Sequence, residues 1–435
     1  MRPRSPPLTD VHNMEQQSKY LGLEGLRGLA CLAVAIGHFT FVFFPYLGTL
    51  YRPVPGATPA FEFEKWVSLP PFSLVYSAGA AVAVFFVMSG YVLTTKFFAT
   101  GEVGPLQAAA AKRYIRLVLP SFAWVVLAWI LWRTGAIITA RANTIGAAGW
   151  VSSWYVGPFS FLNVFTNGLV GAPLFAHTQL NPPLWTIQVE LIGSILLFAM
   201  FALFGRRPIL LLGWFAFFAD VLGFKGPGTL FYLAFLVGAF LTPWLQKHQR
   251  LSVVFIFVGL VGVAYNLTPA FAWLRTFQLP DLSPTGPNIG TFAQAFWNTI
   301  GAILLVAGVI GSRGAGRLLG SRVPVFLGKI SFSVYIVHMP LLMSVGLQAA
   351  AFGQSQNMSF VKSAMFAFVV YITVVMLTGS LFQRLVDAPS MKLSDYIARR
   401  AWRTTSRTSS INTSSPGGKH TGAARQTRAV ESAND

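Results

Sequence analysis

Long apolar stretches recur along this chain and are separated by short polar segments. A helix needs about 20 mainly apolar residues to cross roughly 30 Å of hydrocarbon, and the recurring stretches are close to that length. The pattern predicts an all-α polytopic membrane protein with about ten transmembrane helices. We expect them at roughly residues 26–46, 74–95, 117–135, 184–204, 208–224, 228–245, 252–268, 292–311, 325–347 and 361–383.

One further apolar segment, residues 159–176, does not fit this pattern. It is interrupted by residues that disfavour an uninterrupted span, namely Asn163, Asn167, Gly168, Gly171 and Pro173. We expect it to be interfacial or re-entrant.

Lysine and arginine collect in alternate loops, as they do on the cytoplasmic side of membrane proteins. With a cytoplasmic N-terminus, the inner segments hold 25 of the 32 Lys and Arg residues and the outer segments hold 7. Without the C-terminal tail the bias is still 16 against 7. This predicts that both termini are cytoplasmic and that the protein lies in the plasma membrane or an endomembrane. The net charge of +19 is then mostly loop bias and tail, and it indicates no nucleic-acid partner.

Composition also divides the chain. Residues 1–19 are expected to be a cytoplasmic segment that is too polar to be a cleavable signal peptide, so the first helix should be an uncleaved anchor. Residues 20–398 form the predicted transmembrane domain. Residues 399–435 are rich in Ser, Thr, Gly and Arg and are expected to be a disordered basic tail. Cys31 is the only cysteine, which excludes an internal disulfide and a cysteine-rich zinc site, and we expect no metal.

Arg27 and His38 stand in an otherwise apolar run. Ionisable residues are costly in lipid and usually mark a site. Eleven positions at ~100° each return them to nearly the same helix face, about 16 Å apart along the axis. A neutral imidazole at mid-membrane can accept a proton, so His38 is a candidate general base. The alternative is a histidine that bridges two helices.

Three further ionisable residues are candidates. Arg113 and Arg116 are spaced i and i+3, so they share a helix face and could bind the phosphates of a cytoplasmic donor. The alternative is that they are ordinary positive-inside residues. Glu190 lies within an apolar helix, where an unpaired carboxylate is expensive. We expect it to be protonated or matched to a cation, with His38 and the arginines as available partners, either in catalysis or in a structural ion pair.

The ninth predicted helix carries hydroxyls and a second histidine on one face. Ser331, Tyr335 and His338 follow spacings of four and three. They could line a pocket for an acceptor, or form hydrogen bonds between helices. Ser89 is a candidate for close packing with Gly90 rather than a nucleophile, because no adjacent base is visible.

Taken in order, these segments resemble the acyltransferase-3 family of integral membrane O-acyltransferases, and the tail and long first outer loop look more like its fungal members than its bacterial ones. The resemblance runs from about residue 20 to 389. It rests on an opening Arg-to-His motif, a Phe-Phe-x-x-Ser-Gly element, an Arg-x-x-Arg motif, a Trp-x-x-x-x-Glu segment and a Gly-Lys-x-Ser-x-x-x-Tyr-x-x-His element, found at 23–38, 84–93, 113–116, 184–190 and 328–340. Glu24, Thr186 and Asp387 stand where Asp, Ser and Glu are usual.

The resemblance implies transfer of an acyl group, most often acetyl from acetyl-coenzyme A, to a hydroxyl of a carbohydrate, lipid or secondary metabolite. Acyl-coenzyme A would be a co-substrate, with no bound cofactor. Under this hypothesis Arg113, Arg116 and Arg27 hold the donor phosphates. His38 would deprotonate the acceptor hydroxyl, while Glu190 orients or charge-balances the site.

Two other classes of function remain open at this point. In a proton-coupled transporter, Arg27, His38 and Glu190 would form a relay or bind an anion in transit. The chain has no internal repeat that would pair two halves around a midplane site, which counts against this alternative. In a silent scaffold the buried charges would only pair with one another. The sequence leaves open the acceptor, the acyl length and the oligomeric state.

Overall fold

The computed structural model describes residues 8–51, 54, 56–221, 227–277 and 292–411. Within them the chain is helical and has no strand, so the predicted all-α fold is confirmed. The helices are α1(Leu8–Phe43), α2(Pro45–Thr49), α3(Glu62–Val67), α4(Ala78–Thr100), α5(Gly104–Arg133), α6(Phe161–Thr166), α7(Ala172–Phe175), α8(Trp185–Phe204), α9(Pro208–Val221), α10(Pro227–His248), α11(Ser252–Ala264), α12(Ala272–Arg275), α13(Phe292–Gly311), α14(Arg313–Leu319), α15(Arg322–Leu341), α16(Leu347–Ser355), α17(Phe360–Phe382) and α18(Ala388–Ile411).

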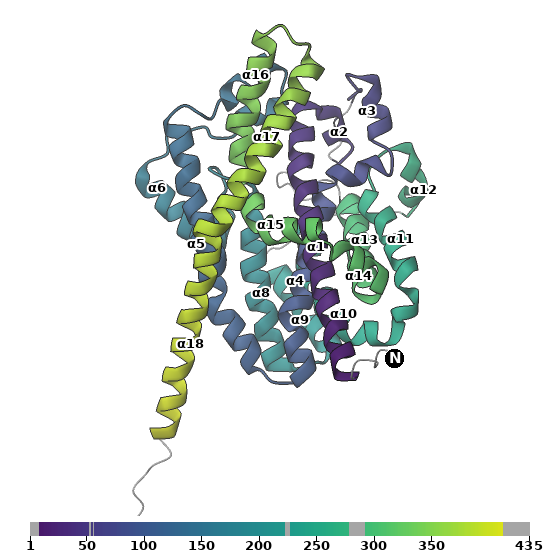
Figure 1. Ribbon diagram of the computed structural model, residues 1–435, viewed down its shortest axis with the longest axis vertical. Coiled ribbons are helices and arrows are strands. Elements are labelled where there is room, and N and C mark those ends of the chain that lie inside the picture. Colours follow the sequence, from purple (N-terminus) through teal and green to yellow (C-terminus); the bar gives the residue numbers. More distant parts are fainter. Residues whose placement is uncertain (1–7, 52–53, 55, 222–226, 278–291, 412–435) are drawn as a thin grey trace, which may run out of the picture.

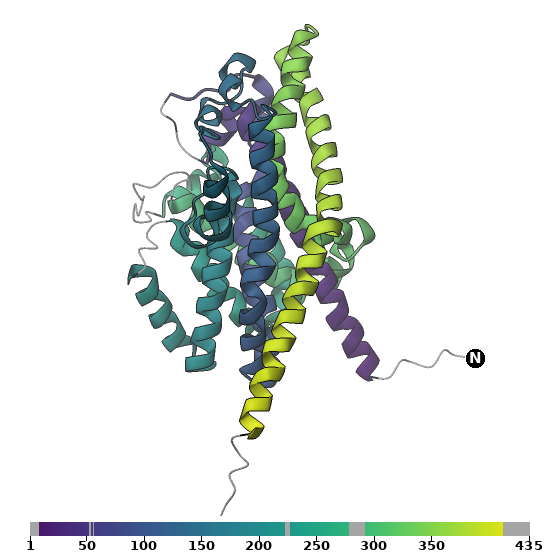
Figure 2. The same cartoon turned by 90° about the vertical axis from the view of Figure 1, so that its left-hand side faces the viewer.

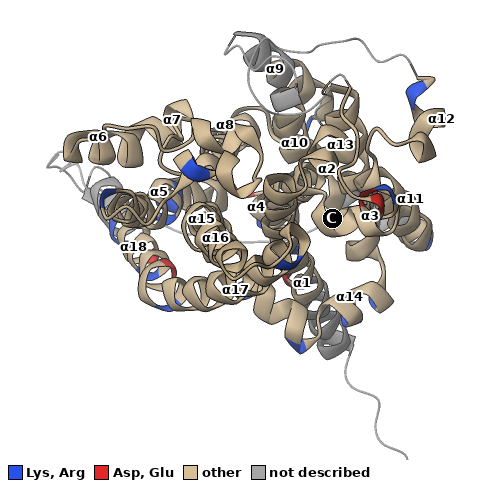
Figure 3. Ribbon diagram, turned by 90° about the horizontal axis from the view of Figure 1, so that it is seen from above, with Lys and Arg blue, Asp and Glu red and all other residues tan. Residues whose placement is uncertain are grey.

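All ten predicted stretches contain a helix. Seven helical segments among the described residues are long and apolar enough to cross a membrane, and they contain α1, α4, α5, α8, α13, α15 with α16, and α17 with α18. The other three predicted stretches hold α9, α10 and α11. Of these, α10 and α11 contribute shorter apolar helices, Thr229–Thr242 and Ser252–Ala264. Seen from above, most of the ribbon is uncharged, as expected for helices in lipid (Figure 3).

Four boundaries differ from the sequence prediction. Helix α1 already begins at Leu8, and α5 begins at Gly104, which places both arginines of the Arg-x-x-Arg motif inside a helix. The segment expected to be interfacial forms α6 and α7, joined by a π-helical turn at Asn167–Gly171. Helix α18 continues to Ile411, into the predicted disordered tail, and the good helix formers Arg399, Arg400 and Ala401 carry it past the predicted boundary at residue 398. Residues 412–435 lie outside the described residues.

The helices run side by side, and α1 begins and α18 ends at the same end of the bundle (Figures 1 and 2). We call this the N-terminal end, and the opposite one the far end. Helix α1 lies against α15, and glycines set their separation. A Cβ on Gly28 would come within 2.4 Å of the Gly328 nitrogen, so the two backbones can approach this closely only without side chains. This contact brings the first and ninth predicted helices together.

Candidate active site

A cavity of about 350 Å³ lies between α1, α4, α5, α8, α15 and the start of α18. Its walls combine apolar side chains with seven charged ones, which are Glu24, Arg27, Arg113, Arg116, Glu190, Lys329 and Asp387. Four are cations and three are carboxylates, so the cavity carries a small excess of positive charge. Three of the five sequence motifs supply these cations, and the fold has brought them to one place from positions about 300 residues apart.

The inner wall of the cavity is an ion-pair network. Arg113 pairs with Glu190, its Nε donates to the Ser194 hydroxyl at 2.9 Å, and the Ser89 hydroxyl donates to the same Glu190 oxygen at 2.9 Å. The side chains of Arg113 and Glu190 are only 7% and 16% exposed. The expectation that Glu190 is matched to a cation is therefore confirmed, and the cation is Arg113. Ser89 contacts this carboxylate, a partner that its Ser-Gly context did not indicate.

The mouth of the cavity, at Arg27, Arg116 and Lys329, is more open. Arg27 forms an ion pair with Glu24 at 2.6 Å, and the two side chains are 38% and 28% exposed. It also donates to the Gly328 carbonyl at 2.9 Å, while its Nε is buried and has no hydrogen-bond partner in the described structure. Arg116 and Lys329 are exposed and make no ion pair with the part of the chain that is described.

His38 and His338 lie against each other, with their ring planes tilted by 44°. His338 Nε2 lies 3.2 Å from His38 Nδ1, and the ring centroids are 5.0 Å apart. His38 Nδ1 is also 3.0 Å from the Val34 carbonyl oxygen, and His338 Nδ1 is 2.6 Å from the Tyr335 carbonyl oxygen. The histidine in the opening motif and the one in the last motif therefore form one pair.

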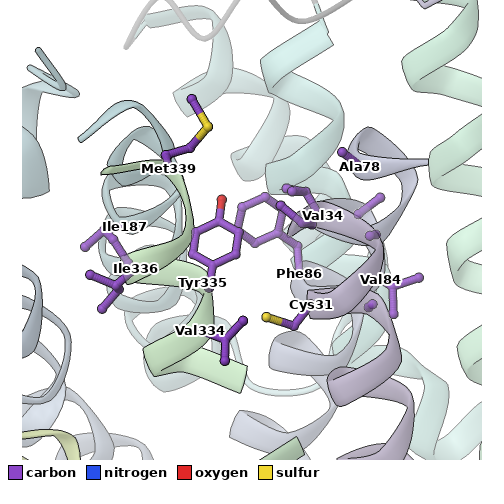
Figure 4. Close-up of a cluster of buried hydrophobic side chains, with 14 of the residues drawn as sticks. Cys31, Val34, Ala78, Val84, Phe86, Ile187, Val334, Tyr335, Ile336 and Met339 are labelled. Atoms are coloured by element: carbon purple, nitrogen blue, oxygen red, sulfur yellow. The ribbon is translucent and has the colours of Figure 1, made fainter. Parts of the chain in front are cut away.

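Neither histidine lines the cavity itself. Tyr335 does, and its ring centroid lies 5.5 Å from that of His338. Figure 4 shows Tyr335 directed from α15 toward a cluster that includes Phe86 of α4 and Cys31 and Val34 of α1. Tyr335 thus links the cavity to the histidine pair, because it lines the one and contacts His338 of the other.

Two of the three residues predicted for an acceptor pocket line this cavity. Ser331 and Tyr335 line the cavity that also holds the arginines, whereas His338 contacts His38 instead. The hydroxyl of Ser331 donates to the Gly328 carbonyl within its own helix at 2.7 Å. Ser194 was not predicted as a site residue, although its position four residues after Glu190 places it on the same helix face.

Comparison with known proteins bears on these motifs directly. A family model described as "Acyltransferase domain" matches residues 20–382, which is most of the chain and contains both histidines and all the cavity-lining residues except Asp387 and Met391. The chain belongs to the acyltransferase-3 family. It is an acyl-transferring enzyme and an integral membrane protein, which confirms the expectation of an enzyme over the transporter and scaffold alternatives.

Curated fungal relatives of this acyltransferase-3 member agree with that assignment. "Acyltransferase R4" of Phoma sp. is 25% identical, over 87% of this chain and 95% of the relative. "Acyltransferase clz18" of Cochliobolus lunatus is 24% identical, over 92% and 97%. "O-acetyltransferase PaAT-1" of Phomopsis amygdali is 24% identical, over 88% and 85%. No solved structure matches the chain.

Proposed function

We propose that this protein is a membrane-embedded O-acetyltransferase that takes its acyl group from acetyl-coenzyme A. The donor would enter at the mouth of the cavity, and His38 would be the general base for a hydroxyl of a carbohydrate, lipid or secondary metabolite. The observation that carries the proposal is the cavity, which combines exposed cations with Tyr335, the residue whose ring contacts His338 of the histidine pair. One relative is named an O-acetyltransferase, which supports acetyl as the group transferred.

The mouth of the cavity suits a polyanionic donor. Arg116 and Lys329 are exposed cations with no ion pair in the described structure, and Arg27 has an Nε–H without a partner. Guanidinium groups bind phosphates through paired hydrogen bonds, and converging cations raise the local concentration of anions. The excess of Lys and Arg in the segments at this end supports a cytoplasmic orientation for it, where coenzyme A thioesters occur.

The proposed reaction needs one base. The acceptor oxygen attacks the thioester carbonyl carbon as its proton passes to His38. The C–S bond then breaks, and the coenzyme A sulfur leaves with the proton returned by the imidazolium. Atoms and charge balance without a metal or an acyl-enzyme intermediate. Because Tyr335 lines the cavity and its ring lies against His338, we propose that the acyl group passes beside this side chain to reach His38.

Turnover of acetyl-coenzyme A by detergent-purified protein tests this function. Wild type and His38→Ala are given the donor and an extract of candidate hydroxyl compounds, and products are detected by mass. We expect acetylated product from wild type and at least a ~10²-fold loss in the variant, since general-base catalysis contributes ~10²–10⁴. His177→Ala is the matched control, because the backbone of His177 donates to the Gly171 carbonyl and its ring packs against Phe175, away from the histidine pair. Substantial activity of His38→Ala would exclude His38 as the base.

A further inference from the structure

The hydrogen bonds of His338 determine which of its nitrogens carries a proton. A carbonyl oxygen can only accept, and the Tyr335 carbonyl oxygen lies 2.6 Å from His338 Nδ1. The Nδ1 must therefore carry the hydrogen. In a neutral imidazole the other nitrogen, Nε2, then has a free lone pair. His338 is completely buried, so its ring has no water with which to exchange these roles.

The same argument then applies to His38. Its Nδ1 lies 3.2 Å from the lone pair of His338 Nε2 and 3.0 Å from the Val34 carbonyl oxygen. Both neighbours are acceptors, so His38 Nδ1 must carry a hydrogen and His38 Nε2 must be bare. The Val34 carbonyl is already the acceptor of the α-helical hydrogen bond from residue 38. The second acceptor for His38 Nδ1 is therefore His338 Nε2, which lies on a different helix. This contact fixes the rotation of the His38 ring.

We infer that His338 is a positioning residue, which holds His38 in the Nδ1–H tautomer with Nε2 free as the base. This inference rests on the proposed function, since it assigns a role to a neighbour of the proposed base. When His38 takes up the acceptor proton, its Nδ1–H strengthens its hydrogen bond to His338 Nε2 and the charge is shared between two rings. The catalytic Asp of serine proteases orients its histidine in the same way. Here the orienting partner, His338, is neutral. It therefore orients His38 without adding a buried charge of its own, which would be costly inside the helix bundle.

Substitutions at His338 separate positioning from packing. In His338→Gln the side-chain oxygen reaches the place of Nε2 and can accept from His38, whereas in His338→Asn the amide reaches only the place of Nδ1. His338→Leu keeps volume without any acceptor. Residues that orient a metal-binding histidine through a hydrogen bond typically contribute 10- to 100-fold, and we expect a similar factor here. We expect kcat to fall by that factor in the Asn and Leu variants and by less than ~5-fold in the Gln variant, with the KM for the donor unchanged in all three.

Ser333→Ala is the control for disturbance of the same helix, because Ser333 is buried on α15 and its hydroxyl has no hydrogen-bond partner in the described structure. It should keep wild-type kcat. If the folded Gln, Asn and Leu variants all had the same kcat, whether high or low, the positioning role would be overturned. An inactive wild type, by contrast, would count against the proposed function itself.

A measurement on wild type covers the case in which the variants do not fold. In protein labelled with ¹⁵N at histidine, the His38 signals are assigned by their loss in His38→Ala. We expect a protonated Nδ1 and an unprotonated Nε2. The opposite tautomer would overturn the inference whatever the kinetics of the variants.

Discussion

The inner wall and the mouth of the cavity both contain an Arg–Glu ion pair, but in different surroundings. Arg113 and Glu190 at the inner wall are 7% and 16% exposed and are tied to Ser194 and Ser89. Arg27 and Glu24 at the mouth are 38% and 28% exposed. Both arginines come from motifs that the sequence analysis selected, and the helix pattern alone could not distinguish them.

The difference separates cations that support the fold from cations that can bind a ligand. A buried pair has given up its water, so neither partner can be removed or attracted elsewhere without a large cost. A half-exposed pair contributes little to stability, so its arginine can leave the carboxylate and bind a phosphate at a small cost in free energy. We therefore assign Arg113 to the wall of the site and propose Arg27 and Arg116 as the donor-binding arginines.

The largest effect is expected when one member of the inner pair is removed. Glu190→Ala or Arg113→Ala leaves an uncompensated buried charge, which typically costs about 3–5 kcal/mol. Both variants should melt at a much lower temperature in detergent and lose activity. The double variant Arg113→Met with Glu190→Leu should be more stable than either single variant, because no charge then remains unpaired. A double variant less stable than either single variant would show that an unpaired buried charge is not what destabilises the single variants.

Much of the architecture follows from the sequence because membrane helices depend on local composition. Every predicted stretch contains a helix, since a 20-residue apolar run has few other stable structures in lipid. The N-terminal start of α5 was not predicted, because residues 104–116 are amphipathic rather than apolar and their helix is stabilised by packing. The α6–α7 segment was not predicted as helical either, since its asparagines and glycines are poor helix formers on their own.

The sequence predicted which residues belong to the site but not how they are arranged in space. The motifs identified His38 and His338 separately, yet nothing in either motif shows that they meet, because the contact depends on how closely α1 and α15 pack at Gly28 and Gly328. The choice of Arg113 rather than Arg27 or His38 as the partner of Glu190 also depends on tertiary packing, in this case that of α5 against α8. Helical periodicity shows on which face of its helix a residue lies. Only the fold shows which other helix packs against that face.

An intermediate effect is expected at the exposed cations. Arg116→Ala should raise the KM for acetyl-coenzyme A by about tenfold, equivalent to ~1.4 kcal/mol, because one charge-assisted contact to phosphate is lost. Its kcat and melting temperature should stay near wild type. Arg116→Lys should recover part of the loss, since charge remains but the paired geometry does not. Arg133→Ala, at the opposite end of α5, is the control that should leave KM unchanged. If Arg116→Ala instead lowered kcat and stability together, Arg116 would have a structural role like that of Arg113 at the inner wall.

The smallest effect, and the sharpest test of the comparison, is expected from Glu24→Gln. The amide keeps the size of the side chain but removes the charge that competes for Arg27. An exposed or half-exposed ion pair contributes about 0–1 kcal/mol, so the melting temperature should change little. With its competitor gone, Arg27 should hold the donor phosphates slightly better, and the KM for acetyl-coenzyme A should fall by a factor of about two or three. Because Glu190→Gln also replaces a carboxylate by an amide, it is the matched variant at the inner wall, and it should destabilise the protein and gain no affinity. Equal responses of the two variants would remove the distinction between a structural pair and an exchangeable one.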